Sequence, residues 1–160
     1  MSVNGIFIFK FMKIKLFILA LVISCFFISC NGQSKKSEVP VVYAEANDPE
    51  LEKAKQEALS TLNQFISSFE KYSKTTKYQY FLKTDFVDNG SHEHMWISIN
   101  KIDKGTFYGV LDNDPEIVKN IKAEDTVQIT KEQIEDWLIL NNKTNEMEGG
   151  YSEKVFEKRE

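Results

Sequence analysis

The sequence predicts an α+β domain in which a long N-terminal helix packs on a curled antiparallel sheet. Three observations predict it: an apolar stripe of helical spacing over residues 48–72, two alternating runs joined by Asn89-Gly90, and several short alternating runs separated by turn residues beyond residue 103. The short strands and tight turns favour a sheet that curls into an SH3-like half-open barrel. An open antiparallel sheet backed by the helix is the alternative.

The first 29 residues resemble a bacterial lipoprotein signal peptide. Lys10, Lys13 and Lys15 precede an apolar run over residues 16–28, which is shorter than the roughly 20 residues of a membrane-spanning helix. The run ends in the lipoprotein box FISC, so we expect lipid attachment at Cys30. An earlier box ending at Cys25, an uncleaved anchor helix and a true start at Met12 are the alternatives.

We therefore expect a protein of the bacterial cell envelope, anchored to the membrane through its lipidated cysteine. Asn31 after the cysteine favours the outer membrane where the cell has one. Residues 30–46 are polar, then briefly apolar, without a period, and predict a flexible tether. Residues 47–160 then form a single domain, because about 110 residues suffice for one core.

Composition excludes several classes of function for the mature chain. Both cysteines lie in the leader or at its end, which leaves the domain without a disulfide, a thiolate nucleophile or a cysteine zinc site. The net charge of the whole chain is −4, and removal of the three leader lysines leaves 17 basic against 24 acidic residues, or −7. Nucleic acid is excluded as a partner, since binding to phosphates requires the opposite sign.

The helix is predicted by its start and by its period. Asp48 can cap it, Pro49 suits the first helical position and Glu50 complements the positive end of the helix. Apolar residues then recur at spacings of three and four, which indicates one buried face: Leu51, Ala54, Ala58, Leu62, Phe65, Phe69 and Tyr72.

The hairpin over residues 78–102 has a register that the turn fixes. Asn89-Gly90 between two alternating runs is the strongest short hairpin signal, and it places Val87 opposite His92. One face then carries the core pairs Leu82–Ile97, Tyr80–Ile99 and Thr84–Met95. The other face, called here the second face, carries Asp85–His94, Lys83–Trp96 and Phe81–Ser98, together with His92.

The second face contains the candidate functional residues Phe81, Lys83, Asp85, His94 and Trp96. A carboxylate opposite an imidazole can fix its tautomer, and a lysine beside an indole can form a cation–π contact. The structural alternative is that Trp96 is covered by the helix or by a curling sheet and that Asp85–His94 is a pair at the rim. His92 and His94 could ligate a metal with Asp85, but the chain has no further histidine, and we expect no metal and no cofactor.

The remaining elements follow from turn signals and short alternating runs. Asp103-Lys104-Gly105 predicts a three-residue hairpin loop with the glycine at a bulge, and Asp112 to Pro115 predicts a turn followed by one short helix. We expect the short helix over residues 116–119, strands over 106–111, 126–129 and 137–140, a capping box from Thr130 to Gln133, a last strand starting at Met147, and a bend at Gly149-Gly150 before a polar tail.

Four ordered motifs resemble the YegJ-like family of proteins of unknown function, catalogued as domain of unknown function twenty-three fourteen. They are EHMWI at 93–97, GVL with NDP at 109–115, DW at 136–137, and GGY at 149–151. The resemblance covers residues 78–152 and departs at Ser152, where threonine is expected, and at Glu124, where glycine is expected. It implies no reaction, only a set of motif positions, which besides His94 and Trp96 are Asn113, Asp114, Asp136, Trp137 and Tyr151.

The sequence favours a non-enzymatic binding module that presents the second face to an envelope protein, peptide or glycan. One alternative is a hydrolase that uses Asp85–His94 as a base pair, which requires His94, Asp136 and Tyr151 to converge on one cleft. The other is a structural or stress-related envelope lipoprotein, which a wholly buried Trp96 would favour.

Overall fold

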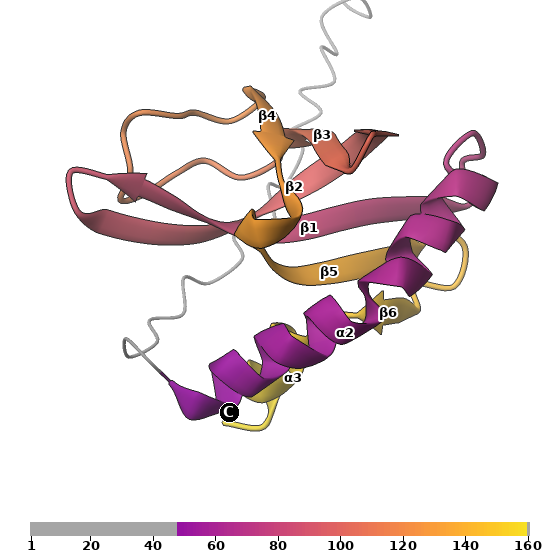
Figure 1. Ribbon diagram of the computed structural model, residues 1–160, viewed down its shortest axis with the longest axis horizontal. Helices are drawn as coiled ribbons and strands as arrows, with labels where there is room; N and C mark the ends of the chain where they lie inside the picture. Colours follow the sequence, from indigo (N-terminus) through magenta and orange to yellow (C-terminus); the bar gives the residue numbers. More distant parts are fainter. Residues whose placement is uncertain (1–47, 160) are drawn as a thin grey trace, which may run out of the picture. The chain divides into compact units, whose positions relative to one another are not determined.

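The computed structural model describes residues 48–159, so the predicted signal peptide, Cys30 and the tether lie outside the described residues. Figure 1 shows one long helix, a sheet and a short C-terminal helix. The elements are α2 (Pro49–Tyr72), β1 (Tyr78–Asp88), β2 (Ser91–Asp103), β3 (Thr106–Leu111), β4 (Thr126–Ile129), the 3-10 turn η2 (Lys131–Gln133), β5 (Ile134–Asn141), β6 (Met147–Gly149) and α3 (Tyr151–Glu157).

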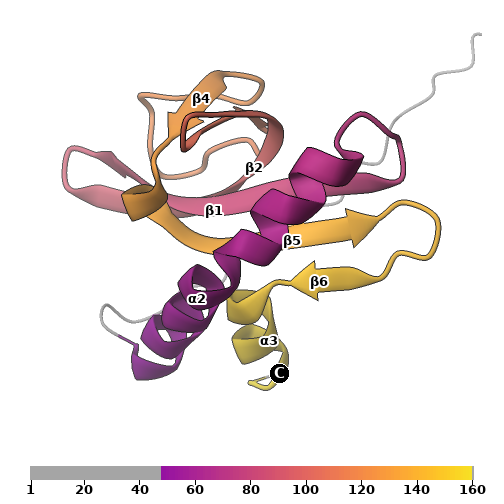
Figure 2. The same cartoon turned by 45° about the vertical axis from the view of Figure 1, so that its right-hand side comes forward.

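The six strands form one open antiparallel sheet in the order β4-β3-β2-β1-β5-β6 (Figure 2). The predicted α+β class with a helix on an antiparallel sheet is confirmed, but the SH3-like barrel is wrong. The long β1–β2 hairpin lies in the middle of the order and separates β3 and β4 from β5 and β6. The two outermost strands, β4 and β6, therefore lie at opposite edges of the sheet and do not pair with each other. A closed barrel would require that pairing.

Helix α2 forms as its sequence predicts. The Asp48 carboxylate accepts hydrogen bonds from the backbone N–H groups of Glu50 at 3.0 Å and Leu51 at 3.4 Å, and Pro49 occupies the first turn. The apolar stripe faces the sheet and buries Ala54, Ala58, Leu62, Phe65 and Phe69.

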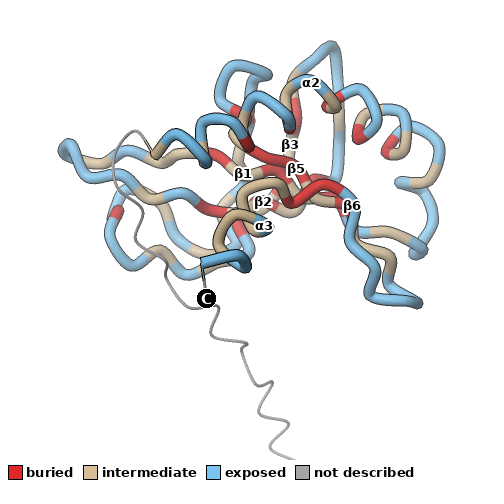
Figure 3. Tube along the Cα trace, turned by 90° about the horizontal axis from the view of Figure 1, so that it is seen from below, coloured by how far each residue is buried: buried red, intermediate tan, exposed pale blue. Residues whose placement is uncertain are grey.

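The core lies between α2 and one face of the sheet, where Figure 3 shows the buried segments of the two layers facing each other. Phe65 is fully buried at its centre and packs on the rings of Tyr80 and Trp137, with centroids 5.6 Å and 6.0 Å away. The Trp137 indole donates a hydrogen bond to the Ala58 carbonyl at 3.0 Å, which ties the helix to β5.

The predicted hairpin register is confirmed from Phe81–Ser98 to the turn. Asn89 and Gly90 have φ of 49° and 82°, which is the left-handed geometry of a two-residue hairpin turn. The β1–β2 pairing ends at Phe81 and Ser98, although both strands continue, so the predicted pair Tyr80–Ile99 is not part of the ladder.

The turn between β2 and β3 differs from its prediction. Asp103 pairs with Thr106, and both Lys104 and Gly105 have positive φ, of 50° and 81°. This is a second two-residue turn rather than a three-residue loop, because the irregularity lies upstream, between Ile99 and Lys101 in the β2–β3 register.

The connection from β3 to β4 has no helix over residues 116–119, and the predicted helix is wrong. The Glu93 side chain on β2 accepts hydrogen bonds from three successive backbone N–H groups, those of Glu116 at 2.8 Å, Ile117 at 2.9 Å and Val118 at 3.0 Å. The Glu93 carboxylate thus accepts the hydrogen bonds of backbone N–H groups in this loop, so that they are paired without a helix. Val118, at the end of this contact, is fully buried.

Strand β5 begins at Ile134, three residues before the predicted start at residue 137, because a bulge interrupts the pattern on which the prediction rested. Lys83 pairs with Asp136 but Thr84 pairs with Ile134, so Glu135 is the extra residue. Beyond β6, Gly149 and Gly150 both have positive φ, as the predicted bend requires. The expected polar tail is wrong, because residues 151–157 form helix α3.

Candidate functional site

The predicted second face exists, and it has the predicted neighbours. Lys83 pairs with Trp96 and Asp85 with His94 in the β1–β2 register, and Phe81 pairs with Ser98 one step further along. The ammonium group of Lys83 lies 5.4 Å from the centroid of the Trp96 ring, as the predicted cation–π contact requires.

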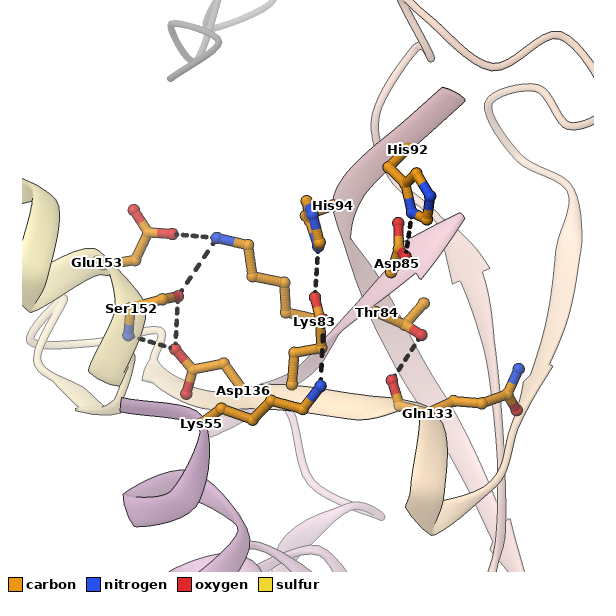
Figure 4. Close-up of polar contacts among 11 residues, drawn as sticks. Lys55, Lys83, Thr84, Asp85, His92, His94, Gln133, Asp136, Ser152 and Glu153 are labelled. Atoms are coloured by element: carbon orange, nitrogen blue, oxygen red, sulfur yellow. Dashed lines mark hydrogen bonds and ion pairs between the residues drawn. The ribbon is translucent and has the colours of Figure 1, made fainter. Parts of the chain in front are cut away.

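Helix α3 covers the part of this face around Lys83. The lysine Nζ lies 3.3 Å from Ser152 Oγ and 3.3 Å from Glu153 Oε1, and its side chain is only 12% exposed (Figure 4). The same Glu153 oxygen accepts a hydrogen bond from the Trp96 indole at 3.2 Å. The C-terminal helix therefore covers this part of the face, whereas the structural alternative predicted from the sequence assigned the cover to the long helix or a curling sheet. Trp96 remains half-buried.

Asp136 holds α3 in this position. The carboxyl group is 1% exposed, and its Oδ2 accepts hydrogen bonds from the backbone N–H and the hydroxyl of Ser152, both at 2.7 Å (Figure 4). Its Oδ1 accepts the backbone N–H of Trp137 at 2.7 Å. A serine hydroxyl fills the role that the expected threonine would have, so this departure from the family pattern keeps the contact.

The two histidines each bind a carboxylate. Asp85 and His94 lie opposite each other as predicted, but their side chains bind other partners. Asp85 Oδ2 lies 2.6 Å from Nδ1 of His92, and His94 Nδ1 lies 2.6 Å from Oε2 of Glu135. The second Glu135 oxygen is 3.4 Å from Nζ of Lys55 on α2. The β5 bulge brings Glu135 to this place, and the alternating pattern of the sequence carries no signal for it.

The electrostatics of the pair between His94 and Glu135 favour its charged form. The hydrogen bond from Glu135 raises the pKa of His94 above its usual value, and partial burial offsets only part of this effect. Burial raises the pKa of Glu135, but His94 and then Lys55 outweigh it, so the net pKa is lowered. The His94 side chain is 52% exposed, and the pair is therefore largely screened by water.

The hydrolase geometry is not present. The Tyr151 hydroxyl lies 2.8 Å from the Thr61 hydroxyl on α2, and its ring packs against Trp137. Asp136 is covered by α3, and His94 points toward Glu135. His94 thus binds Glu135, Asp136 binds Ser152 and Trp137, and Tyr151 binds Thr61, so the three side chains do not converge on one cleft.

The other motif positions lie in the core and in the loop. Trp137 is fully buried, Asn113 is half-buried and Asp114 is exposed, the last two in the connection after β3. Within residues 48–159, no three or more histidine, aspartate, glutamate or cysteine side chains are placed to hold a metal ion. Over the same residues, no helix has the length and apolar character needed to cross a membrane.

Comparison with known proteins adds the family. A family model described as "Uncharacterized protein conserved in bacteria (DUF2314)" matches residues 48–159. The chain belongs to the DUF2314 family. It is similar to the uncharacterized protein YegJ of Escherichia coli (strain K12), with 29% identity over 132 residues that cover 82% of each chain. No solved structure gives a significant match.

The DUF2314 match confirms the resemblance carried by the four motifs and extends it. Helix α2 belongs to the matched region, whereas the motifs covered only residues 78–152. In this DUF2314 chain the motif residues Asp136, Trp137 and Tyr151 contact one another or α2. Their contacts join β5, α2 and α3, which explains these motif positions by the fold.

Proposed function

We propose that this protein is a lipid-anchored binding module of the bacterial cell envelope, attached through Cys30, and that the uncovered part of the second face contacts another envelope protein. The anchor is supported by the basic residues, apolar run and FISC box of the leader. Mass spectrometry of the protein from its native membrane tests it. We expect a diacylglycerol adduct on the chain that Cys30→Ser removes, and an unmodified wild-type chain would contradict the anchor.

A row of half-buried apolar side chains across the sheet supports the binding surface. Val110 on β3, Phe81 on β1 and Leu138 on β5 lie at one level, because Ser98 pairs with Val110 and with Phe81, and Phe81 pairs with Leu138. None of the three is fully buried. Because the three side chains adjoin one another across the strands, they offer a contiguous apolar patch, which is the kind of surface at which partner proteins bind.

Trp96 borders this row and favours a binding role over a purely structural one. An indole wholly buried under α3 would indicate a packing role alone, but Trp96 keeps part of its surface in contact with solvent. Aromatic side chains with one exposed edge and one polar group are frequent energetic centres of protein interfaces. Lys83, in contrast, is held by α3 and contributes by positioning the helix.

The binding surface can be tested by site-specific photo-cross-linking in living cells. A cross-linking residue at Val110 should give a discrete adduct with one envelope protein, and Phe81→Glu should abolish it. A cross-linking residue at Gln64, an exposed position on α2, which packs on the opposite face of the sheet, is the matched control.

Two results would contradict the proposed surface. One is an adduct from Gln64 equal to that from Val110, and the other is an adduct that persists unchanged in Phe81→Glu. An adduct with a second copy of the same chain would assign the surface to self-association instead. Far-ultraviolet circular dichroism of the purified variant establishes that Phe81→Glu is folded.

A further inference from the structure

The sheet contains a fork between β1 and β2, at the end of the hairpin away from the turn. Pairing between these strands ends at Phe81 and Ser98, yet β1 continues to pair with β5 as far as Tyr78, and β2 continues to pair with β3 as far as Asp103. The two strands diverge in this region, as Figure 1 shows at the right-hand end of the sheet. Each strand thus has one edge that the other no longer pairs with.

A cleft of about 220 Å³ lies in this fork. It is lined by the end of α2 and by both diverging strands, through Phe69, Ser73, Tyr78, Gln79, Tyr80, Ser98, Ile99 and Asn100. An apolar cavity of about 150 Å³ is large enough for benzene, so one aromatic or branched aliphatic side chain fits here. The wall combines apolar rings with hydroxyl and amide groups.

The chain segment that leads from α2 into β1, beside the cleft, carries more positive than negative charge. From Phe69 to Tyr80 the chain has Lys71, Lys74 and Lys77, all exposed, against the single acidic residue Glu70. The Lys77 ammonium lies 4.8 Å from the ring centroid of Tyr78 in the cleft wall. This local charge is opposite in sign to that of the chain as a whole, which is −4. An acidic group is therefore the complement of the cleft.

We infer that the fork is a binding site for an extended peptide segment that inserts one large apolar side chain into the cleft and places acidic side chains against the lysines at its mouth. Open strand edges pair with extended peptides through main-chain hydrogen bonds, and a pocket beside the edge selects a side chain.

The site adjoins the proposed binding surface at Ser98, but its cleft lies between the diverging strands, and it can be tested without knowing the natural partner. The probe is the capped pentapeptide Ac-Asp-Val-Phe-Val-Asp-NH2, titrated into the full-length chain and followed by the backbone amide resonances in a two-dimensional NMR spectrum. We expect saturable shifts at Gln79, Ser98 and Asn100. Replacing the phenylalanine of the probe by alanine should weaken binding roughly tenfold.

Variants of the protein separate the parts of the site. Ser73→Trp, at an exposed position on the rim, should fill the cleft and abolish binding. The double substitution Lys71→Glu and Lys77→Glu should weaken binding roughly 3- to 10-fold, since it removes two exposed ion pairs. The matched control, Lys53→Glu with Lys131→Glu, reverses two exposed lysines elsewhere and should leave the affinity unchanged.

The outcomes distinguish this inference from the proposed function. Absence of saturable shifts with the phenylalanine probe, or shifts that persist in Ser73→Trp, would overturn the fork as a peptide site. Equal shifts with N-acetylglucosamine and none with the peptide would also overturn it. Phe81→Glu should leave peptide binding intact. Peptide binding without a discrete adduct from Val110 would contradict the proposed surface alone. An adduct from Val110 without peptide binding would contradict the fork alone.

Discussion

The contact between Glu93 and the loop after β3 predicts a measurable loss of stability in Glu93→Gln. One carboxylate oxygen accepts the N–H groups of Ile117 and Val118, and the other accepts that of Glu116. The glutamine carbonyl can take the place of only one oxygen, so its amide group faces the remaining donor. A hydrogen bond to a charged acceptor contributes about 1.5–3 kcal/mol and a neutral one about 0.5–1.5.

The expected loss in the free energy of unfolding is about 2 kcal/mol. One charged hydrogen bond disappears and two become neutral, but two of the three donors, on Glu116 and Ile117, are exposed and can bind water instead, which lowers the total. Urea denaturation near pH 7 measures this difference. Glu148→Gln, at an exposed carboxylate on β6, is the matched control and should change stability by less than about 0.5 kcal/mol.

The pH dependence gives a second measurement of the same contact. Partial burial raises the pKa of Glu93, but the three backbone donors outweigh it, so the net pKa lies below the usual 4.5. The stabilisation is therefore complete above pH 4.5 and is lost as the pH falls through the lowered pKa. The difference between wild type and Glu93→Gln should shrink toward pH 3. A difference below 0.5 kcal/mol at pH 7, or one independent of pH, would refute the reasoning.

Three further substitutions have expected results. Gly149→Ala should cost about 3 kcal/mol in urea denaturation, because a Cβ there would lie 2.2 Å from the Trp137 carbonyl oxygen at a φ of +84°, and a cost under 1 kcal/mol would contradict this packing. Glu124→Gly should raise the melting temperature, with a gain of about 0.5–1 kcal/mol, because Glu124 has a φ of 70°; an unchanged or lower value would disprove it. Glu135 raises the pKa of His94, so the free energy of unfolding of wild type should exceed that of His94→Gln most near pH 6, by at most about 1 kcal/mol. This difference should decline as the pH rises through the raised pKa. A difference that grows with pH would exclude the ion pair.

The long helix and the central hairpin could be predicted from sequence because local signals determine both. Asp48 and Pro49 mark the start of α2, and the period of its apolar residues predicts the buried face. Asn89-Gly90 allows only a tight turn, and a strand has only two faces, so the register and the buried side of the hairpin follow together. The open sheet could not be predicted in the same way, because strand order depends on pairings across long sequence separations.

Two misses in the candidate site have a common physical cause, which is an interruption of a regular pattern. The bulge at Glu135 interrupts the alternation of buried and exposed side chains along β5, so that Ile134 and Trp137, three residues apart, both point into the core. A strand pattern with a period of two therefore identifies only the part of β5 after the bulge. The same residue takes His94 away from Asp85. Alternation within one strand cannot show which carboxylate a neighbouring strand supplies.

The C-terminal helix could not be predicted because its stability comes from partners far along the chain. Its seven residues are too few for a helix to be stable in isolation. Asp136 binds its first turn, and Glu153 reaches Lys83 and Trp96. Without the position of β5, residues 151–157 have only the composition of a polar tail.

The contact between Arg159 and the start of α2 makes the described domain a nearly closed loop of chain. The Arg159 guanidinium binds the carboxylates of Asp48 and Glu50, with 2.6 Å between Nη1 and Asp48 Oδ2, and this hydrogen bond lowers the pKa of Asp48 to about 2. Both ends of the domain therefore leave it at one point. A mechanical load applied between residues 48 and 159 would therefore act first on this ion pair.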